Sequence, residues 1–238
     1  MKQGLFIFLT LIQLSFILTA DKAITIFIAG DSTAAERDTS NDNPERGWGQ
    51  MLQDYFNKNF VVVENHARGG RSSKSFIDEG RWDEILKNMK KGDYAIIQFG
   101  HNDGVEDEAR HTDPNTTFIE YLTKYATDTI EHGGIPILMS PVSRRWWKNH
   151  VLVSAEGDYR FGAEKVSKKL KVHFVDACTI TEKVVLDLGE EGSKKLFMIS
   201  EGKDDNTHYT IYGATTTAKL LAEAISKEVP ELEQYHKK

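Results

Sequence analysis

The sequence predicts an α/β fold: a three-layer α/β/α sandwich in which helices cover both faces of a parallel sheet. Short β-branched runs alternate with amphipathic stretches from Asp21 onward, which is the pattern of strands joined by crossover helices. Five such runs are present, enough for one open sheet. The chain has 238 residues, of which 39% are hydrophobic, so one domain can bury a sufficient core without disulfides or metal ions.

Each predicted strand is a short run rich in Ile, Val, Phe or Tyr that ends in a glycine or a polar cluster. In chain order the predicted strands are Ile24–Ala29, Val61–Glu64, Tyr94–Phe99, Ile135–Met139 and Val172–Val175. Long polar loops follow at Thr33–Arg46, Asn102–Pro114 and Ser140–Ala155. Because ligands bind at the carboxyl ends of the strands in open parallel sheets, we expect the chemistry of the protein in these loops.

The stretches between the strands predict helices. They lie near Trp48–Asn57, Trp82–Met89, Phe118–His132, Gly157–Leu170 and Thr181–Leu188, with a last helix from Ile211 to Ile225. The last is the clearest, because its apolar residues recur at three- and four-residue spacing. Thr210 is its expected N-terminal cap and Pro230 its expected stop.

The first residues of the chain differ from the rest. Lys2 precedes the apolar run Leu5–Leu18, so residues 1–20 have the pattern of a secretory signal peptide and residues 21–238 form the single domain. The alternative is an uncleaved anchor, but the run is shorter than the ~20 residues that a span needs. Leu18 is not the small residue preferred near a cleavage site, which leaves that site open. We expect a secreted or periplasmic protein with no membrane attachment after cleavage.

Charge and cysteine content exclude some classes of function. Thirty Lys and Arg stand against 36 Asp and Glu, a net charge of -6, and the basic residues are scattered. This argues against a nucleic-acid partner. The single cysteine, Cys178, excludes an intramolecular disulfide and a cysteine-built zinc site, and we expect it at a buried strand end.

A serine, a histidine and an aspartate stand where nucleophilic catalysis could use them. Ser32 follows the first strand, and His208 follows Asp205 by three residues just before the last helix. A serine hydroxyl attacks an ester only when a base accepts its proton and a third group orients that base. Each motif alone also fits a turn or a solvated loop. Ala34 stands where the nucleophile elbow of α/β-hydrolases has its second glycine, so a different hydrolase architecture is needed.

Two further motifs could stabilise an oxyanion. Gly69 and Gly70 follow the second strand, and a backbone N–H without a side chain can approach a substrate closely. Asn102, in the GHND motif after the third strand, offers a side-chain amide. A tight turn and an Asx-turn are the structural alternatives.

These four blocks, in this order, resemble those of the SGNH (GDSL-type) hydrolase superfamily. Within it, AGDSTAA, GGRSSKSF, FGHND, SPVSRR and DNTHYT are similar to the rhamnogalacturonan acetylesterases and their bacterial relatives, over about Ile24 to Ala222. The resemblance implies a flavodoxin-like sheet of five parallel strands, no metal or organic cofactor, and a carboxylic ester hydrolase with a Ser-His-Asp triad.

The resemblance also implies a role for each matching residue. The implied catalytic residues are Ser32 as nucleophile, His208 as base and Asp205 as its orienting carboxylate; the implied oxyanion donors are the N–H groups of Ser32 and Gly70 and the side chain of Asn102. Asp205 is preferred to Asp204 because the family spacing to histidine is three. Gly69 remains an alternative to Gly70, since the doubled glycine permits a shift of one residue.

The expected reaction is removal of acetyl groups from a plant cell-wall polysaccharide, above all the rhamnogalacturonan of pectin. The candidate substrate contacts are Arg71, Arg144, Arg145, Trp146 and Trp147, since guanidinium groups pair with uronate carboxylates and indoles stack on sugars. Paired tryptophans also close cores, which is the alternative reading. His101 is expected either to brace the site or to be hydrogen-bonded for structure alone, and Asp31 to accept loop N–H bonds.

The sequence is also compatible with other functions. Asp103 with Asp205 and His208 could be drawn as metal ligands, but catalytic zinc usually takes more than one histidine or cysteine, so no metal is expected. The substrate could instead be acetylxylan, a sialic-acid acetate, a lipid or a thioester. A carbohydrate-binding protein without catalysis is disfavoured because no member of the constellation is missing. The acetylated sugar position, the acyl-chain preference and the oligomeric state are left open.

Overall fold

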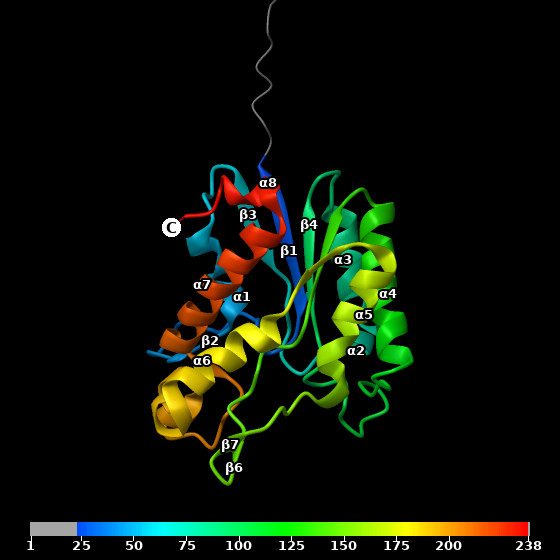
Figure 1. Ribbon diagram of the computed structural model, residues 1–238. Coiled ribbons are helices and arrows are strands. Elements are labelled where there is room, and N and C mark those ends of the chain that lie inside the picture. The colour runs from blue at the N-terminus through cyan, green and yellow to red at the C-terminus, as the bar shows by residue number, and fades with distance from the viewer. Residues whose placement is uncertain (1–22, 238) are drawn as a thin grey trace, which may run out of the picture.

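The computed structural model describes residues 23–237, so the expected signal peptide lies outside the described residues. Five parallel strands form the central sheet (Figure 1), in the order β3-β1-β4-β5-β8. The strands are β1 (Ile24–Gly30), β3 (Val61–Asn65), β4 (Tyr94–Gln98), β5 (Ile135–Met139) and β8 (His173–Val175). The predicted strands are confirmed to within one residue at each end, and so is the α/β class.

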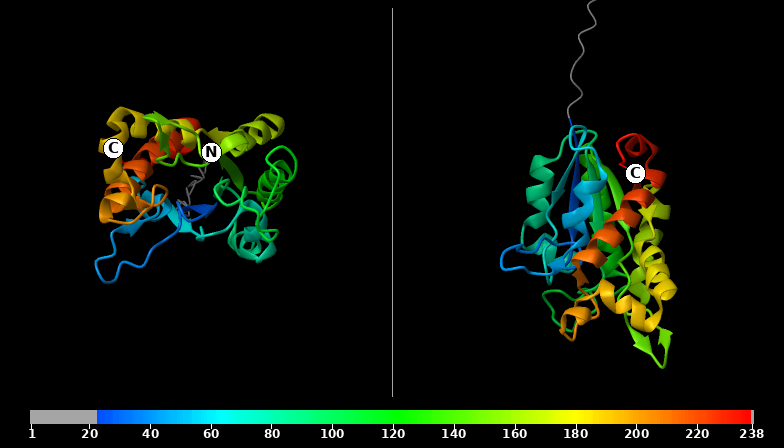
Figure 2. Two further views of the ribbon diagram at one scale, coloured as in Figure 1. Left: turned by 90° about the horizontal axis from the view of Figure 1, so that it is seen from below. Right: turned by 90° about the vertical axis from the view of Figure 1, so that its left-hand side faces the viewer.

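Side chains of the central strands alternate between two buried faces, which is why these strands read as continuous apolar runs. Ile26 and Ile28 pack on one side of the sheet, and Phe27 and Ala29 on the other. The first face is covered by α1 (Trp48–Met51), α6 (Ala177–Gly192), α7 (Ile211–Glu228) and α8 (Pro230–Glu233). The second is covered by α2 (Ser73–Asp78), α3 (Arg81–Asn88), α4 (Thr117–Glu131) and α5 (Gly162–Leu170). The views in Figures 1 and 2 show the resulting three layers.

Two predicted helices are shorter than expected because each is partly a 3₁₀ turn. The segment Trp48–Asn57 continues from α1 into η1 (Leu52–Tyr55), and Gly157–Leu170 begins with η2 (Gly157–Phe161) before α5. Apolar periodicity does not distinguish these tighter turns from an α-helix, since both place side chains three residues apart on one face.

Two further expectations need correction. Cys178 lies in the first turn of α6 and not at a strand end, because Asp176 caps that helix immediately after β8 by accepting a hydrogen bond from Thr179 N. The short helix α2 lies in a stretch for which no helix was predicted. It is initiated by a capping box in which Ser72 and Ser75 each accept a hydrogen bond from the other's backbone N–H.

Two small antiparallel ladders lie outside the central sheet. β2 (Glu45–Arg46) pairs with β9 (Tyr209–Thr210), and β6 (Trp147–Lys148) pairs with β7 (Val151–Leu152) to form a hairpin at the edge where the central strands end (Figure 1). Thr210 caps α7 as expected, its side chain accepting from Gly213 N at 3.1 Å. Between α6 and β9 run the turns η3 (Ser193–Leu196) and η4 (Met198–Glu201). None of the helices in the described part of the chain has both the length and the apolar character needed to cross a membrane.

Candidate active site

Ser32 lies two residues beyond the end of β1, between the loops that follow β3 and β4. Its neighbours Asp31 and Thr33 are buried, whereas Ser32 is partly exposed. Arg37 Nη2 donates to Ser32 O at 2.7 Å and ties the loop back onto itself. The serine is thus presented to solvent from a backbone that is held on the inside.

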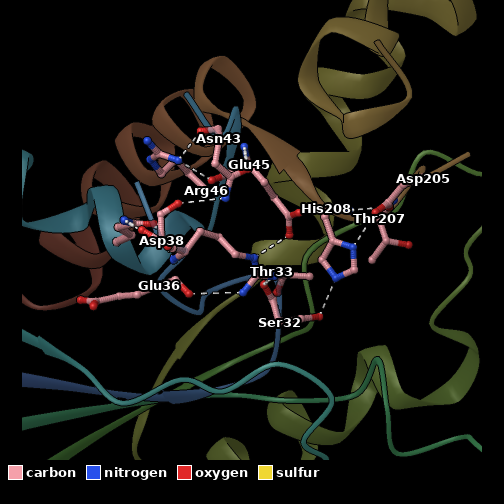
Figure 3. Close-up of polar contacts among 12 residues, drawn as sticks. Ser32, Thr33, Glu36, Asp38, Asn43, Glu45, Arg46, Asp205, Thr207 and His208 are labelled. Atoms are coloured by element: carbon pink, nitrogen blue, oxygen red, sulfur yellow. Dashed lines mark hydrogen bonds and ion pairs between the residues drawn. The ribbon is translucent and has the colours of Figure 1, made fainter. Parts of the chain in front are cut away.

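The structure brings Ser32, His208 and Asp205 into one line of contacts (Figure 3). His208 Nε2 is 2.9 Å from Ser32 Oγ, and His208 Nδ1 is 2.7 Å from Asp205 Oδ2. All three side chains are partly exposed. In this arrangement the imidazole can accept the serine proton at one nitrogen while its other nitrogen is held by the carboxylate.

The loop before α7 is shaped so that His208 reaches Ser32. Asp205 Oδ1 accepts from the backbone N–H groups of Thr207 and His208, each at 2.9 Å, which closes the D-x-x-H turn. The backbone of η4 holds the loop from the other side, through Met198 N to His208 O and Ile199 N to Asp205 O. Beyond His208, β9 pairs with β2 and joins this loop to the segment that follows Ser32.

Hydrogen bonds keep Asp205 ionised. Burial alone would raise the pKa of its carboxyl, but the donors supplied by His208 and Thr207 outweigh burial and hold the pKa below the usual value. A charged carboxylate at this position fixes the imidazole so that Nδ1 carries a proton and Nε2 faces Ser32 with its lone pair.

The candidate oxyanion donors come from the two neighbouring loops. Asn102 Nδ2 donates one hydrogen bond to Arg71 O at 3.0 Å, which leaves its second N–H for another acceptor. Gly70 has a positive φ of 78°, a conformation that favours glycine, and a Cβ at Gly69 would lie 3.7 Å from Ser32 Cβ. Gly69 therefore lies beside Ser32 and Gly70 directly follows it, so the N–H groups of both are candidate donors.

Two buried carboxylates accept hydrogen bonds that hold the loops after β1 and β4 in place. Asp103 accepts hydrogen bonds from Ser73 N at 3.0 Å, Ser73 Oγ at 2.5 Å and Gly100 N at 3.0 Å, which joins the turn after β4 to the start of α2. Burial raises the pKa of Asp103 to about 6 although these donors act in the opposite direction. Asp31 accepts from Thr33 N, as expected, and also contacts His101.

Comparison with known proteins identifies the family. A model of the GDSL-like lipase/acylhydrolase family matches residues 28–219. The chain belongs to this family. It is 37% identical to rhamnogalacturonan acetylesterase RhgT of Bacillus subtilis (strain 168), over 87% of this chain and 91% of that protein. It is 36% identical to the probable rhamnogalacturonan acetylesterase YesY of the same organism, over 85% and 92%.

Solved structures agree with the family's fold. The crystal structure of YxiM from Bacillus subtilis matches with a TM-score of 0.74 at 27% identity, over 87% of this chain and 57% of that chain. The acetylxylan esterase Axe2 from Geobacillus stearothermophilus matches with a TM-score of 0.61 at 17% identity, over 86% and 93%, a likeness of fold alone. The expected SGNH (GDSL-type) membership is confirmed, and with it a carboxylic ester hydrolase.

The expected substrate contacts of this GDSL-family chain are dispersed. Arg145 is buried, with 6% of its surface exposed, and donates to Ser193 Oγ, Asn206 Oδ1 and Glu190 O, so its guanidinium supports the loop that carries Asp205. Arg144 Nη2 donates to His101 O at 3.0 Å. Both arginines were expected to contact substrate, but their guanidinium groups donate hydrogen bonds to other parts of the protein.

The two tryptophans differ in their exposure to solvent. Trp147 packs against the core, in line with the alternative of a core-closing residue. Trp146 is 47% exposed, beside the β6–β7 hairpin, with Lys148 Nζ 5.7 Å from its ring centre. Of these two indoles, that of Trp146 is the more exposed to solvent.

A polar cleft of about 520 Å³, the arginine cleft, has Gly69 in its lining, and a Cβ at Gly69 would lie 3.7 Å from Ser32 Cβ. Its charged lining residues are Arg37, Arg68, Arg71, Arg81, Glu36 and Glu84. Arg71 and Arg81 share the carboxylate of Glu79, whereas Arg68 is exposed and its guanidinium makes no hydrogen bond or ion pair within residues 23–237. Only Arg71 was expected near substrate. Glu36, Arg37 and Arg68 lie in loops and Arg81 and Glu84 in α3, and no sequence motif indicates that they line one cleft.

The described residues hold no group of three or more His, Cys, Asp and Glu side chains arranged to bind a metal ion.

Proposed function

We propose that this esterase removes acetyl groups from rhamnogalacturonan, an acidic plant cell-wall polysaccharide, by acyl transfer through Ser32. One observation carries the proposal: the unbroken contacts from Asp205 to His208 to Ser32, at 2.7 and 2.9 Å, in a chain 37% identical to a rhamnogalacturonan acetylesterase.

The reaction would begin with attack of Ser32 Oγ on the acetyl carbonyl carbon. His208 Nε2 accepts the hydroxyl proton as the new C–O bond forms, and Asp205 stabilises the resulting imidazolium. His208 then returns the proton to the sugar oxygen as the ester bond breaks, which leaves an acetyl group on Ser32. A water molecule, deprotonated by His208, then attacks the acetyl-enzyme. The bond between the acyl carbon and Ser32 Oγ breaks, His208 returns the proton to Oγ, and acetate is released.

The charge that forms on the carbonyl oxygen needs donors. The backbone N–H of Ser32, the N–H of Gly70 or Gly69 and the free N–H of Asn102 are the candidates, since they come from three loops that meet at the acyl site. Each such donor typically contributes ~10²- to 10³-fold to kcat.

Two surfaces of the protein suit an acidic sugar polymer. The arginine cleft could take the carboxylate of a uronate residue, with Arg68 as the cation not yet engaged by the protein. Exposed Trp146, beside the β6–β7 hairpin, could stack on a sugar ring. These surfaces, with the acetylesterase relatives, favour a carbohydrate over a lipid ester.

A substrate panel tests the proposal. Acetate release from acetylated rhamnogalacturonan should exceed that from acetylated xylan, and p-nitrophenyl acetate should be hydrolysed far faster than a long-chain p-nitrophenyl ester. Faster deacetylation of xylan would reject the pectin substrate. Preference for the long-chain ester would reject a carbohydrate esterase.

We also infer secretion, from the signal-peptide pattern of residues 1–20. Expression with the native N-terminus should deliver the protein outside the cytoplasm, with an N-terminus near residue 21 by mass spectrometry. An intact N-terminus in the cytoplasm would reject this inference.

A further inference from the structure

A buried ion pair joins the two loops that carry the proposed nucleophile and the proposed oxyanion donor. Asp31 immediately precedes Ser32, and His101 immediately precedes Asn102. Asp31 Oδ2 lies 2.8 Å from His101 Nδ1, and the two side chains are 0% and 1% exposed. Since β1 and β4 are neighbours in the sheet, the pair connects the ends of two adjacent strands.

The contacts of His101 indicate its protonation state. Its Nε2 is 2.8 Å from Val142 O, so both ring nitrogens face oxygen acceptors. A neutral imidazole carries one N–H, and only the imidazolium can donate at both positions. Asp31 Oδ1 in turn accepts from Thr33 N at 2.9 Å and Thr33 Oγ1 at 2.8 Å, as an ionised carboxylate does.

The surrounding charges favour the same state. Burial alone would lower the pKa of His101, but the attraction of Asp31 outweighs burial and raises it, with Glu156 adding to the rise and Arg144 opposing it. Burial would likewise raise the pKa of Asp31, and His101 holds it below the usual value. Glu156 Oε1 is 3.9 Å from His101 Nε2, Arg144 Nη2 donates to His101 O, and buried Asp103 lies nearby on the same turn.

We propose that the Asp31–His101 ion pair is a positioning element that holds the Ser32 hydroxyl in register with the Asn102 amide, and that it does so only while His101 is protonated. The inference rests on the proposed roles of Ser32 and Asn102. A buried ion pair is a weak source of stability, whereas a charge-assisted hydrogen bond fixes the distance between two loops. Oxyanion donors must lie ~2.7–3.1 Å from the charged oxygen, and a displacement of ~1 Å costs ~10²-fold in rate.

The Asp31–His101 ion pair is sensitive to pH because the imidazolium of His101 can lose a proton. A neutral His101 has one N–H for two acceptors, so either Asp31 or Val142 O loses its partner. Because the pKa of folded His101 is raised, the imidazolium is lost only as pH rises through that raised pKa. The pairing, and the catalytic geometry that depends on it, should therefore weaken on the alkaline side.

The first test is the alkaline limb of kcat for p-nitrophenyl acetate, with Ser32→Ala as the blank for spontaneous hydrolysis. We expect kcat to fall reversibly at alkaline pH while KM and the circular dichroism spectrum change little. Asp31→Asn should move this limb down by about one pH unit or more and lower its plateau about 10- to 100-fold. A kcat that shows no alkaline fall at any pH at which the circular dichroism spectrum reports a folded protein would overturn the proposal.

The second test does not depend on activity. Ring-¹⁵N NMR of the histidines in Ser32→Ala protein, with His101→Gln to assign the signal, should show His101 doubly protonated at pH 7; a neutral ring would overturn the proposal. His132→Gln is the matched control, since His132 is exposed at the end of α4 and should leave the alkaline limb unchanged. A folded His101→Gln protein with kcat within about twofold of wild type would reduce the pair to structural support. Activity that survives Ser32→Ala would instead reject the proposed function. The NMR measurement would still show whether His101 is protonated in the ion pair, because it does not depend on activity.

Discussion

The side-chain amide of Asn102 has two N–H groups, and Arg71 O occupies one of them. If the other binds charge that exists only in the transition state, Asn102→Ala should lower kcat by ~10²- to 10³-fold with a much smaller change in KM. Steady-state kinetics with p-nitrophenyl acetate measures both constants. Asn59→Ala, in the exposed loop before β3 at the opposite edge of the sheet, is the control. A change confined to KM would make Asn102 a substrate-binding residue.

The acid side of the pH profile belongs to a single residue. The pKa of Asp205 is held below its usual value, so this carboxylate stays ionised at every pH where histidine titrates. His208 must be neutral to accept the serine proton, so kcat/KM should fall through one ionisation as pH is lowered. A pH-rate profile with a slope of one measures this. A slope of two on the acid side would mean that a second group, such as Asp103, must also be ionised.

At the scale of single residues, the position of each motif relative to the strands predicted which residues form the site. The burial of an individual side chain could not be predicted from the sequence. Ser32, Asp205 and His208 converge because each occupies a place that the strand order defines. Arg145 shows the limit: from the sequence it is an arginine in a loop after a strand, and only the packing of η3 and α6 around it makes it a buried support.

Helix α7 approaches η3 so closely that only glycine fits at its first turn. A Cβ at Gly213 would lie 1.9 Å from Leu196 O, a backbone atom that cannot move without η3. We expect Gly213→Ala to lower the free energy of unfolding by about 3 kcal/mol or more. Urea denaturation measures this. Gly192→Ala, whose Cβ would meet Leu188 at an ordinary 3.6 Å, should cost far less; equal costs would contradict the close contact.

The arginine cleft and the β6–β7 hairpin are rival positions for the acidic part of the substrate. Arg68→Gln should raise KM for acetylated rhamnogalacturonan about 3- to 10-fold, and added salt should weaken the wild-type enzyme similarly, because an exposed ion pair is modest and screened. Lys148→Gln removes one positive charge from the hairpin and should leave this KM unchanged. The reverse result would place the carboxylate at the hairpin.

At the scale of elements, strands were predictable and short local structures were not. A central strand must be apolar on both faces, so its sequence marks it unambiguously. The pairing of Glu45 and Arg46 with Thr210 and Tyr209 leaves no such mark, because two residues carry no periodicity and their partner is far along the chain. Helix α2 was missed for a related reason: its start depends on hydrogen bonds between serines and not on an apolar face.

The whole molecule explains how residues 176 positions apart form one site. Ser32 follows β1, which lies between β3 and β4 in the sheet. Ser32 is therefore beside the loop after β3, which carries the glycines, and the loop after β4, which carries Asn102. His208 precedes α7, which packs on the same side of the sheet as α1, and the β2–β9 ladder links the two ends directly. The sequence predicted the convergence through the order of the motifs. The arginine cleft could not be predicted, since its lining comes from two loops, the end of β3 and a helix whose relative positions depend on tertiary packing.

The most direct test of the account is covalent labelling of the nucleophile. The enzyme is treated with a p-nitrophenyl alkylphosphonate, digested and mapped by mass spectrometry. We predict one phosphonyl group on the peptide that contains Ser32, loss of esterase activity in proportion to labelling, and labelling slowed by ~10³-fold or more in His208→Ala, which lacks the base. Labelling of a different residue, or full activity in protein labelled at Ser32, would contradict the account.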